Sequence, residues 1–262
     1  MRTLYLECNA GISGDMTVGA LLDLGANQEG LLNALESIPA DGFEIKISRV
    51  MKDGLDCQDF DVVLEHPNHD HDMEYLHGEY HEHEHHHHHE HRHLNDIIHI
   101  IEETNISDNA KDIAKKIFEK IAEGEAKAHE TSKDIVHFHE VGAIDSIVDI
   151  IAIAFCLDDL GIDKVIVPSL SEGTGTVRCA HGVLPVPVPA VKYIVEDNNI
   201  KLDIMDIEGE FVTPTGAAIV AAVRTSDTLP SNMNIVKTGL GAGKREYKRA
   251  SILKAMIVEE SD

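Results

Sequence analysis

Ile144-Asp-Ser-Ile-Val-Asp-Ile-Ile-Ala-Ile-Ala-Phe-Cys-Leu-Asp-Asp-Leu160 is the stretch that decides the fold of this chain. Apolar residues occupy almost every side of a helix drawn over it, so we expect a helix that is buried in the core. A short strand at residues 164–167 is predicted directly after it. A buried helix that leads into a strand is typical of a mixed α/β fold.

The rest of the chain also alternates between helical and strand-like patterns. Thr213 and Pro214 are predicted to open a helix as its N-cap and first residue. Prolines should keep the extended stretch 176–188 out of a sheet interior. Further helices are expected at 15–24, 28–37, 94–103 and 109–129, and further strands at 2–6, 43–50, 57–64, 234–239 and 251–258, with 43–64 as a hairpin. We therefore predict a compact α/β domain over residues 1–262.

Composition and charge exclude several classes of partner. The 262 residues include 22 Lys and Arg against 47 Asp and Glu, which gives a net charge of −25. Nucleic acid and anionic membranes both bind positively charged protein surfaces, so we expect neither as a partner. No secretory signal or membrane-spanning run is visible, and the four cysteines make no C-x-x-C pair. We therefore expect a cytoplasmic protein without disulfides, and a homo-oligomer stays open.

A histidine-rich segment, residues 66–93, interrupts the predicted domain. Thirteen of the chain's 18 histidines lie in it, with Glu and Asp interleaved, and its densest run is His85, His86, His87, His88 and His89. Imidazole and carboxylate together suit borderline divalent ions such as nickel, zinc, cobalt and copper. The alternative is a solvated, disordered linker that binds nothing. We favour metal capture by a flexible insertion.

A second constellation, His137-Phe-His-Glu-Val-Gly-Ala-Ile-Asp145-Ser-Ile-Val-Asp149, leads into the buried helix. In extended chain, His137 and His139 would point to the same side. Asp145 and Asp149 are one helical turn apart and share a face. Ionised carboxylates on a buried helix are costly unless they are paired or bind a metal. We favour a site here; the alternative is that Asp145 caps the helix and the histidines are core residues.

The loop Ser13-Gly14-Asp15 is a weaker candidate. It follows the first predicted strand and opens a predicted helix. Backbone N–H groups at a helix start can bind an anion. Asp15 is itself an anion, so a helix capped by Asp15 is an equally good interpretation.

Two later glycine-flanked stretches are also weaker candidates. Arg178 could hold a carboxylate or phosphate through its fork of donors, and Cys179 and His181 beside it could bind a soft metal. Residues 239–243, three of them glycines, precede the densest basic cluster, at 244–249. We interpret 239–243 as a solvated turn in preference to a phosphate contact.

Five stretches of the chain form a set: Leu4-Tyr-Leu-Glu-Cys-Asn-Ala-Gly-Ile-Ser-Gly-Asp-Met16, His137-Phe-His-Glu-Val-Gly-Ala-Ile-Asp-Ser-Ile-Val-Asp149, Gly175-Thr-Val-Arg-Cys-Ala-His-Gly-Val-Leu-Pro-Val-Pro-Val-Pro-Ala190, Thr213-Pro-Thr-Gly-Ala217 and Gly239-Leu-Gly-Ala-Gly243. Together they resemble the nickel insertion proteins of nickel-pincer cofactor synthesis, the LarC family. They follow the family's order over nearly the whole chain, and the histidine-rich insertion lies where the family carries one.

The resemblance implies a nickel insertion reaction. Members of the family insert nickel into pyridinium-3,5-bisthiocarboxylic acid mononucleotide, forming two Ni–S bonds and one Ni–C bond, to give the cofactor of lactate racemase and related enzymes. The reaction consumes CTP and needs Mn²⁺ or Mg²⁺, and the family binds CTP in a separate C-terminal domain. The sequence given ends at Asp262 without that domain, so we expect either the N-terminal half of a split protein or a fragment. We expect a C-terminal CTP-binding half as partner, and we do not expect CTP binding or unaided lyase-type turnover from this chain alone.

We give the candidate residues hypothetical roles in that reaction. A Ni–C bond requires the loss of a ring proton, so a base must sit beside the metal. The catalytic candidates are His139, Glu140, Asp145 and Asp149. The expected nickel ligands are His137 and His139, and we expect them to receive nickel gathered by His85, His86, His87, His88 and His89. The substrate-binding candidates are Ser13, Gly14, Asp15 and Arg178. The competing functions are a nickel-storage protein or metallochaperone without chemistry, and a metal-dependent hydrolase of a phosphorylated small molecule.

Overall fold

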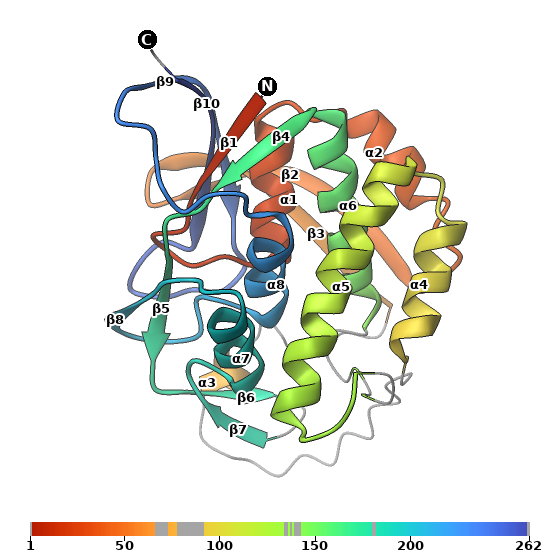
Figure 1. The fold of residues 1–262 in the computed structure, drawn as a ribbon, viewed down its shortest axis with the longest axis vertical. Coiled ribbons are helices and arrows are strands. Elements are labelled where there is room, and N and C mark those ends of the chain that lie inside the picture. Colours follow the sequence, from red (N-terminus) through yellow and green to blue (C-terminus); the bar gives the residue numbers. More distant parts are fainter. Residues whose placement is uncertain are drawn as a thin grey trace.

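The computed structural model describes residues 2–65, 73–77, 92–133, 136, 138, 143–179 and 182–260, and it forms a mixed α/β fold (Figure 1). The helices are α1 (Gly14–Asp23), α2 (Gln28–Leu35), α3 (Met73–His77), α4 (Leu94–Glu103), α5 (Asp108–Ala128), α6 (Ile144–Asp159), α7 (Pro189–Asp197) and α8 (Pro214–Val223). The strands are β1 (Arg2–Glu7), β2 (Phe43–Lys52), β3 (Leu55–Leu64), β4 (Ile162–Ile166), β5 (Leu170–Thr174), β6 (Thr176–Cys179), β7 (Gly182–Pro185), β8 (Leu202–Glu208), β9 (Met233–Ala242) and β10 (Ile252–Glu260). The prediction of an α/β fold is confirmed.

The main sheet has the strand order β2-β3-β9-β10-β1-β4. Its centre joins the two ends of the chain, because β1 pairs with β10 in antiparallel register, with Tyr5 opposite Met256. The other edge of β1 pairs in parallel with β4, the strand that follows α6. Two smaller sheets, β5 with β8 and β6 with β7, lie outside the main sheet.

Helix α1 packs on the main sheet with almost no side chains in between. A Cβ atom at Gly241 or Gly239 of β9 would overlap the backbone of α1, at the carbonyl oxygens of Met16 and Ala20. On the helix side, a Cβ at Gly19 would lie 2.6 Å from the carbonyl oxygen of Gln58 in β3. Glycine is therefore required on both surfaces, because any side chain would push the helix away from the sheet.

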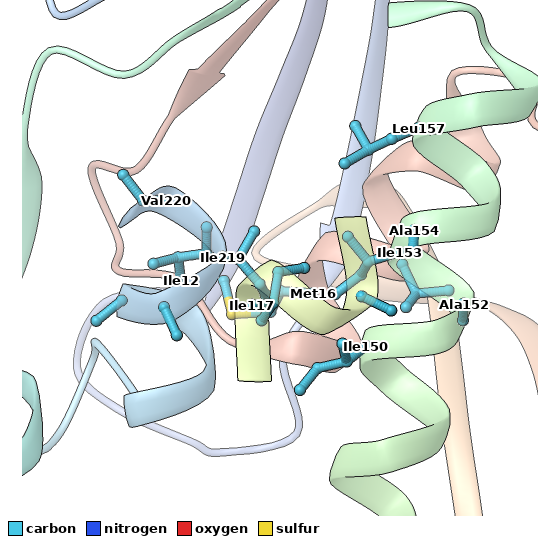
Figure 2. Packing of buried hydrophobic residues seen from close by; sticks show 14 of the residues in the cluster. Ile12, Met16, Ile117, Ile150, Ala152, Ile153, Ala154, Leu157, Ile219 and Val220 are labelled. Carbon is cyan, nitrogen blue, oxygen red and sulfur yellow. The ribbon is translucent and has the colours of Figure 1, made fainter. Parts of the chain in front are cut away.

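Helix α6 is the centre of the hydrophobic core, as its sequence predicts. Nine of its residues are buried, including Ile150 and Ile153. Figure 2 shows side chains of α6 meeting Met16 of α1, Ile117 of α5 and Ile219 of α8 in one apolar layer. Within the described residues, no helix is both long and apolar enough to cross a membrane.

The structure confirms most predicted elements and adds four, one of which is the short helix α3. The hairpin over 43–64 forms as β2 and β3, and Thr213 caps α8 with Pro214 at its first position. Helix α7 and the strands β5 and β8 were not predicted. Pro189, directly after the extended stretch 176–188, is the first residue of α7, where its fixed φ suits the first turn of a helix.

A buried carboxylate fastens the loop before α8. Oε1 of Glu172, in β5, accepts hydrogen bonds from the backbone N–H groups of Gly173 (2.8 Å), Phe211 (2.7 Å) and Val212 (3.2 Å). The residue is fully buried, and burial raises the pKa of Glu172 to about 7, against the opposing effect of these three hydrogen bonds. Phe211 in turn accepts the N–H of Ile12 at 2.9 Å, so the loops before α1 and α8 are held side by side.

Gly241→Ala should lower the free energy of unfolding by about 1–3 kcal/mol, because the new methyl group collides with the backbone of α1. Thr238→Ala, at an exposed position of the same strand, should change it by less than about 0.5 kcal/mol. Urea unfolding of both variants measures the difference. Equal effects would show that α1 and β9 can separate at little cost.

Glu172→Gln should change how stability depends on pH. Because the folded-state pKa is raised from 4.5 to about 7, Glu172 favours the folded state below pH 4.5, and this contribution is lost as the pH rises through about 7. Glutamine does not titrate but keeps a carbonyl acceptor. The wild-type chain should therefore lose up to about 3 kcal/mol relative to the variant between pH 4 and 8, measured by urea unfolding. Parallel stability curves would refute the raised pKa.

Candidate functional site

A pocket of about 280 Å³ lies where the ends of five helices converge. Its wall includes the first residues of α1, α6, α7 and α8, and the last turn of α5. The N-terminus of a helix carries unpaired N–H groups and a partial positive charge. Four such ends around one pocket create a region that favours anions, in a chain whose net charge is −25.

The start of α1 directly contacts Asp149 of α6. A Cβ atom at Gly14 would lie 2.9 Å from Cγ of Asp149 and would overlap its Oδ2 atom. Only glycine therefore lets the carboxylate approach the backbone at the N-terminus of α1. The other carboxylate oxygen, Oδ1, is buried and has no hydrogen-bond partner among the described residues.

Neither predicted aspartate caps its helix. Ser13 is the N-cap residue of α1, and its hydroxyl donates a hydrogen bond to Asp15 in the first turn. Ala143 is the N-cap residue of α6, which places Asp145 inside the helix. The interpretation of Asp15 or Asp145 as a helix cap is thus wrong. Both side chains line the pocket instead.

Four aspartates surround the floor of the pocket. Asp15, Asp61, Asp145 and Asp149 all line it. Burial raises the pKa of Asp149 well above its usual range, and the charges of Asp15, Asp145 and Asp61 raise it further. Lys244 acts in the opposite direction. Among the described residues, however, no three His, Cys, Asp or Glu side chains are placed to hold a metal ion.

Lys244 enters the acidic floor from the loop after β9. Its Nζ lies 2.6 Å from Oδ1 of Asp59 and 3.5 Å from Oδ1 of Asp61, both in β3. Its side chain and that of Asp59 are largely buried, so the ion pair is weakly screened. Lys244 is therefore held beside Asp149 by the neighbouring strand.

Another part of the pocket wall carries a cation and an aromatic side chain from the segment between β9 and β10. Arg245 forms an ion pair with Glu210, and the hydroxyl of Tyr247 donates to the Glu210 carbonyl at 2.9 Å. The Tyr247 ring packs on Phe211 with 4.4 Å between ring centroids. Burial is the main cause of a raised Tyr247 pKa. Arg178, on β6, also lines the pocket.

The structure brings together every predicted site residue that it describes. Ser13, Gly14, Asp15, Asp145, Asp149 and Arg178 line this one pocket, and Cys179 lies beside them. His137, His139, Glu140, the run His85 to His89 and His181 lie outside the described residues. The pairing of Asp145 and Asp149 on one helical face, predicted from their spacing, is confirmed.

One predicted feature needs correction, and several pocket residues were missed. Residues 239–243 are not a solvated turn: Gly239 and Gly241 lie in β9 and are buried against α1. The basic residues after them do reach the pocket, through Lys244 and Arg245. Asp61, Glu210 and Tyr247 were missed because each reaches the pocket only through tertiary folding, and its local sequence gives no signal.

Comparison with known proteins places the whole described fold in one family. The family model described as "Nickel insertion protein" matches residues 4–262. The pyridinium-3,5-bisthiocarboxylic acid mononucleotide nickel insertion protein of Alkaliphilus metalliredigens is 54% identical over 259 residues, which are 98% of this chain and 61% of that protein. The protein of the same name from Acetivibrio thermocellus is 42% identical, over 98% of this chain and 60% of its own length.

A more distant relative is the putative nickel insertion protein of Dictyoglomus thermophilum, 37% identical over 99% of this chain and 61% of that protein. No solved structure matches the chain. The chain spans about three-fifths of the length of these relatives. The match over residues 4–262 and the identities over nearly the whole chain lead to one conclusion: this chain belongs to the nickel insertion protein family.

Proposed function

We propose that this chain binds pyridinium-3,5-bisthiocarboxylic acid mononucleotide in the pocket and takes part in the insertion of nickel into it. The reaction is a CTP-dependent cyclometallation of the lyase class. The observation that carries the proposal is the convergence of four helix N-termini and four aspartates on a single pocket. The helix N-termini suit an anionic mononucleotide. The aspartates suit a divalent cation and can accept a proton.

Binding of the substrate rests on the helix ends. A mononucleotide phosphate and two thiocarboxylates are anions, which an acidic chain repels unless local positive groups are presented. The N-termini of α1, α7 and α8 present backbone N–H groups, and Arg178 adds a charged fork. We assign the phosphate and thiocarboxylates to these groups, with Ser13, Gly14 and Asp15 at the start of α1.

Proton removal is assigned to the aspartate floor. When a Ni–C bond forms, the ring C–H bond breaks and its proton passes to a base, while nickel takes the electron pair of the carbon. A carboxylate with a raised pKa is a stronger base than an ordinary one. Asp149 has that property, and Asp145 lies one turn before it. We propose Asp149 as the base, with Asp145, His139 and Glu140 as its alternatives.

Nickel is the cargo of this reaction. We propose that His85 to His89 gather it and that His137 and His139, close to Asp145 in the chain, receive it before transfer. Imidazole nitrogen suits nickel better than the carboxylates of the floor do.

We do not assign the binding of CTP and its Mn²⁺ or Mg²⁺ to the described residues of this chain. The glycines of 239–243, the best candidate for a phosphate loop, are occupied by their contacts with α1. We therefore propose that a C-terminal CTP-binding partner supplies this step, from the part of the relatives that the chain does not cover.

Mixing the chain with the mononucleotide, Ni²⁺, Mg²⁺, CTP and the C-terminal partner tests the proposed function. Nickel insertion predicts a new absorption band and a product whose mass has gained nickel and lost protons. A storage protein or metallochaperone would bind nickel and leave the spectrum of the mononucleotide unchanged. A hydrolase would release phosphate from the mononucleotide even when CTP is left out. Either of the last two results would overturn the proposal.

Asp149→Asn should lower the rate of nickel insertion at saturating nickel by about 10²-fold or more, because the amide cannot accept the ring proton. Asp145→Asn should lower the rate of nickel insertion by a smaller factor if Asp149 is the base. Asp112→Asn, on the exposed surface of α5, is the matched control and should be neutral. Single-turnover rates measure all three, and a wild-type rate for Asp149→Asn would remove this residue from the chemistry.

Lys244→Met should move the pH dependence of the reaction. The ammonium lowers the pKa of Asp149, so its loss raises that pKa further. The ionised base then forms only at higher pH, and the acidic limb of the rate profile should shift upward by about one pH unit. Lys248→Met, at an exposed position of the same loop, should leave the limb in place. A lower rate with an unshifted limb would mean that Lys244 acts only through stability.

A further inference from the structure

A short part of the histidine-rich segment is built into the wall of the pocket. Helix α3 (Met73–His77) lies against β6, the strand that carries Arg178. Leu76 is only 4% exposed and lines the pocket, and Met73 packs against the hydrophobic core. His77, the last residue of α3, is thereby held next to the wall of the pocket.

The hydrogen bond of His77 decides which ring nitrogen carries the proton. Nδ1 lies 3.1 Å from the backbone carbonyl oxygen of Thr176. A carbonyl oxygen can only accept, so Nδ1 must be the donor. In the neutral imidazole the lone pair is then on Nε2. Metal-binding histidines commonly have this arrangement, with one nitrogen donating to a carbonyl and the other ligating the ion.

The Nε2 atom of His77, which carries the lone pair, is a buried polar atom. Nε2 is inaccessible to solvent and has no hydrogen-bond partner among the described residues. A buried polar atom left in this state lowers stability, so its presence in a fixed position calls for a ligand. An imidazole lone pair suits nickel.

The surroundings of His77 connect it to the pocket. The edge of its ring meets the ring of Tyr247, with 6.0 Å between centroids and an interplanar angle of 69°. Tyr247 lines the pocket and is held by its hydrogen bond to the Glu210 carbonyl. Together, Thr176 and Tyr247 fix the orientation of the imidazole before any metal arrives.

We propose that Nε2 of His77 is a nickel ligand next to Tyr247 and the pocket. The assignment rests on the proposed function for the choice of nickel as the ion. It requires no covalent step: neutral Nε2 replaces one water molecule of the hydrated ion. Nickel held there would lie beside Tyr247, which lines the pocket.

The test uses the full 262-residue chain with a reduced histidine background. In this background His66, His69, His71, His81, His83, His85, His86, His87, His88, His89 and His91 are replaced by glutamine, and His77 is kept. His77→Gln is then added, because glutamine can still donate to the Thr176 carbonyl but offers no imidazole. The matched control is His99→Gln, whose side chain is 72% exposed on α4.

Equilibrium dialysis against Ni²⁺ should show that the background chain binds one nickel more tightly than the His77→Gln chain, by about tenfold or more. The His99→Gln chain should behave like the background. Equal binding in all chains, or no saturable binding in the background, would overturn the proposal. Neither the mononucleotide nor the C-terminal partner is present, so this result is independent of whether nickel insertion itself succeeds.

A second measurement, made without the His77→Gln variant, keeps the proposal testable if that variant misfolds. Long-range ¹H–¹⁵N spectra of the histidine-labelled background chain report the tautomer of each ring. We expect His77 as the Nδ1–H form, and we expect its Nε2 signal to be lost on addition of Ni²⁺ before that of His99. An Nε2–H tautomer, or loss of both signals together, would refute the assignment even if the dialysis variants proved unstable.

Discussion

The contact between α1 and β9 is the constraint on which the pocket depends. Because glycines at 239 and 241 let the helix backbone rest on the strand, the axis of α1 is fixed relative to the sheet. Its N-terminus is then held against Asp149, and the loop before it pairs with the loop before α8. A displacement of α1 would therefore move two helix ends and the acidic floor together. The position of the site is therefore a consequence of backbone packing between α1 and β9.

The pocket combines groups that attract anions with groups that are themselves anionic. Four helix N-termini attract anions, and four aspartates already occupy the same volume. Asp149 is where the two meet: it lies against the N-terminus of α1, yet burial and three neighbouring carboxylates favour its neutral form. A single ammonium, Lys244, partly offsets that repulsion. A substrate that brings both anionic groups and a divalent cation would satisfy both halves of this arrangement.

The sequence was most informative where local rules are strong. The apolar pattern of 144–160 located the central helix, the spacing of Asp145 and Asp149 placed both on one face, and Thr213 with Pro214 located the start of α8. Glycine was the least reliable guide, because the same residue marks a turn and a close backbone approach. Residues 239–243 were therefore misinterpreted. Asp61 and Tyr247 could not be assigned to the site because only the tertiary fold brings their strand and loop to α6.

The pairing of the first strand with the last has a consequence for how the chain folds. β1 and β10 are neighbours in the sheet although almost the entire sequence separates them, and β10 alone joins β1 to β9. Closing so long a loop costs conformational entropy before any contact repays it, and such topologies fold slowly. During synthesis on the ribosome, β1 must wait for β10 to emerge. Until then the apolar faces of α1 and α6 lack their complete sheet, and the nascent chain is exposed to aggregation.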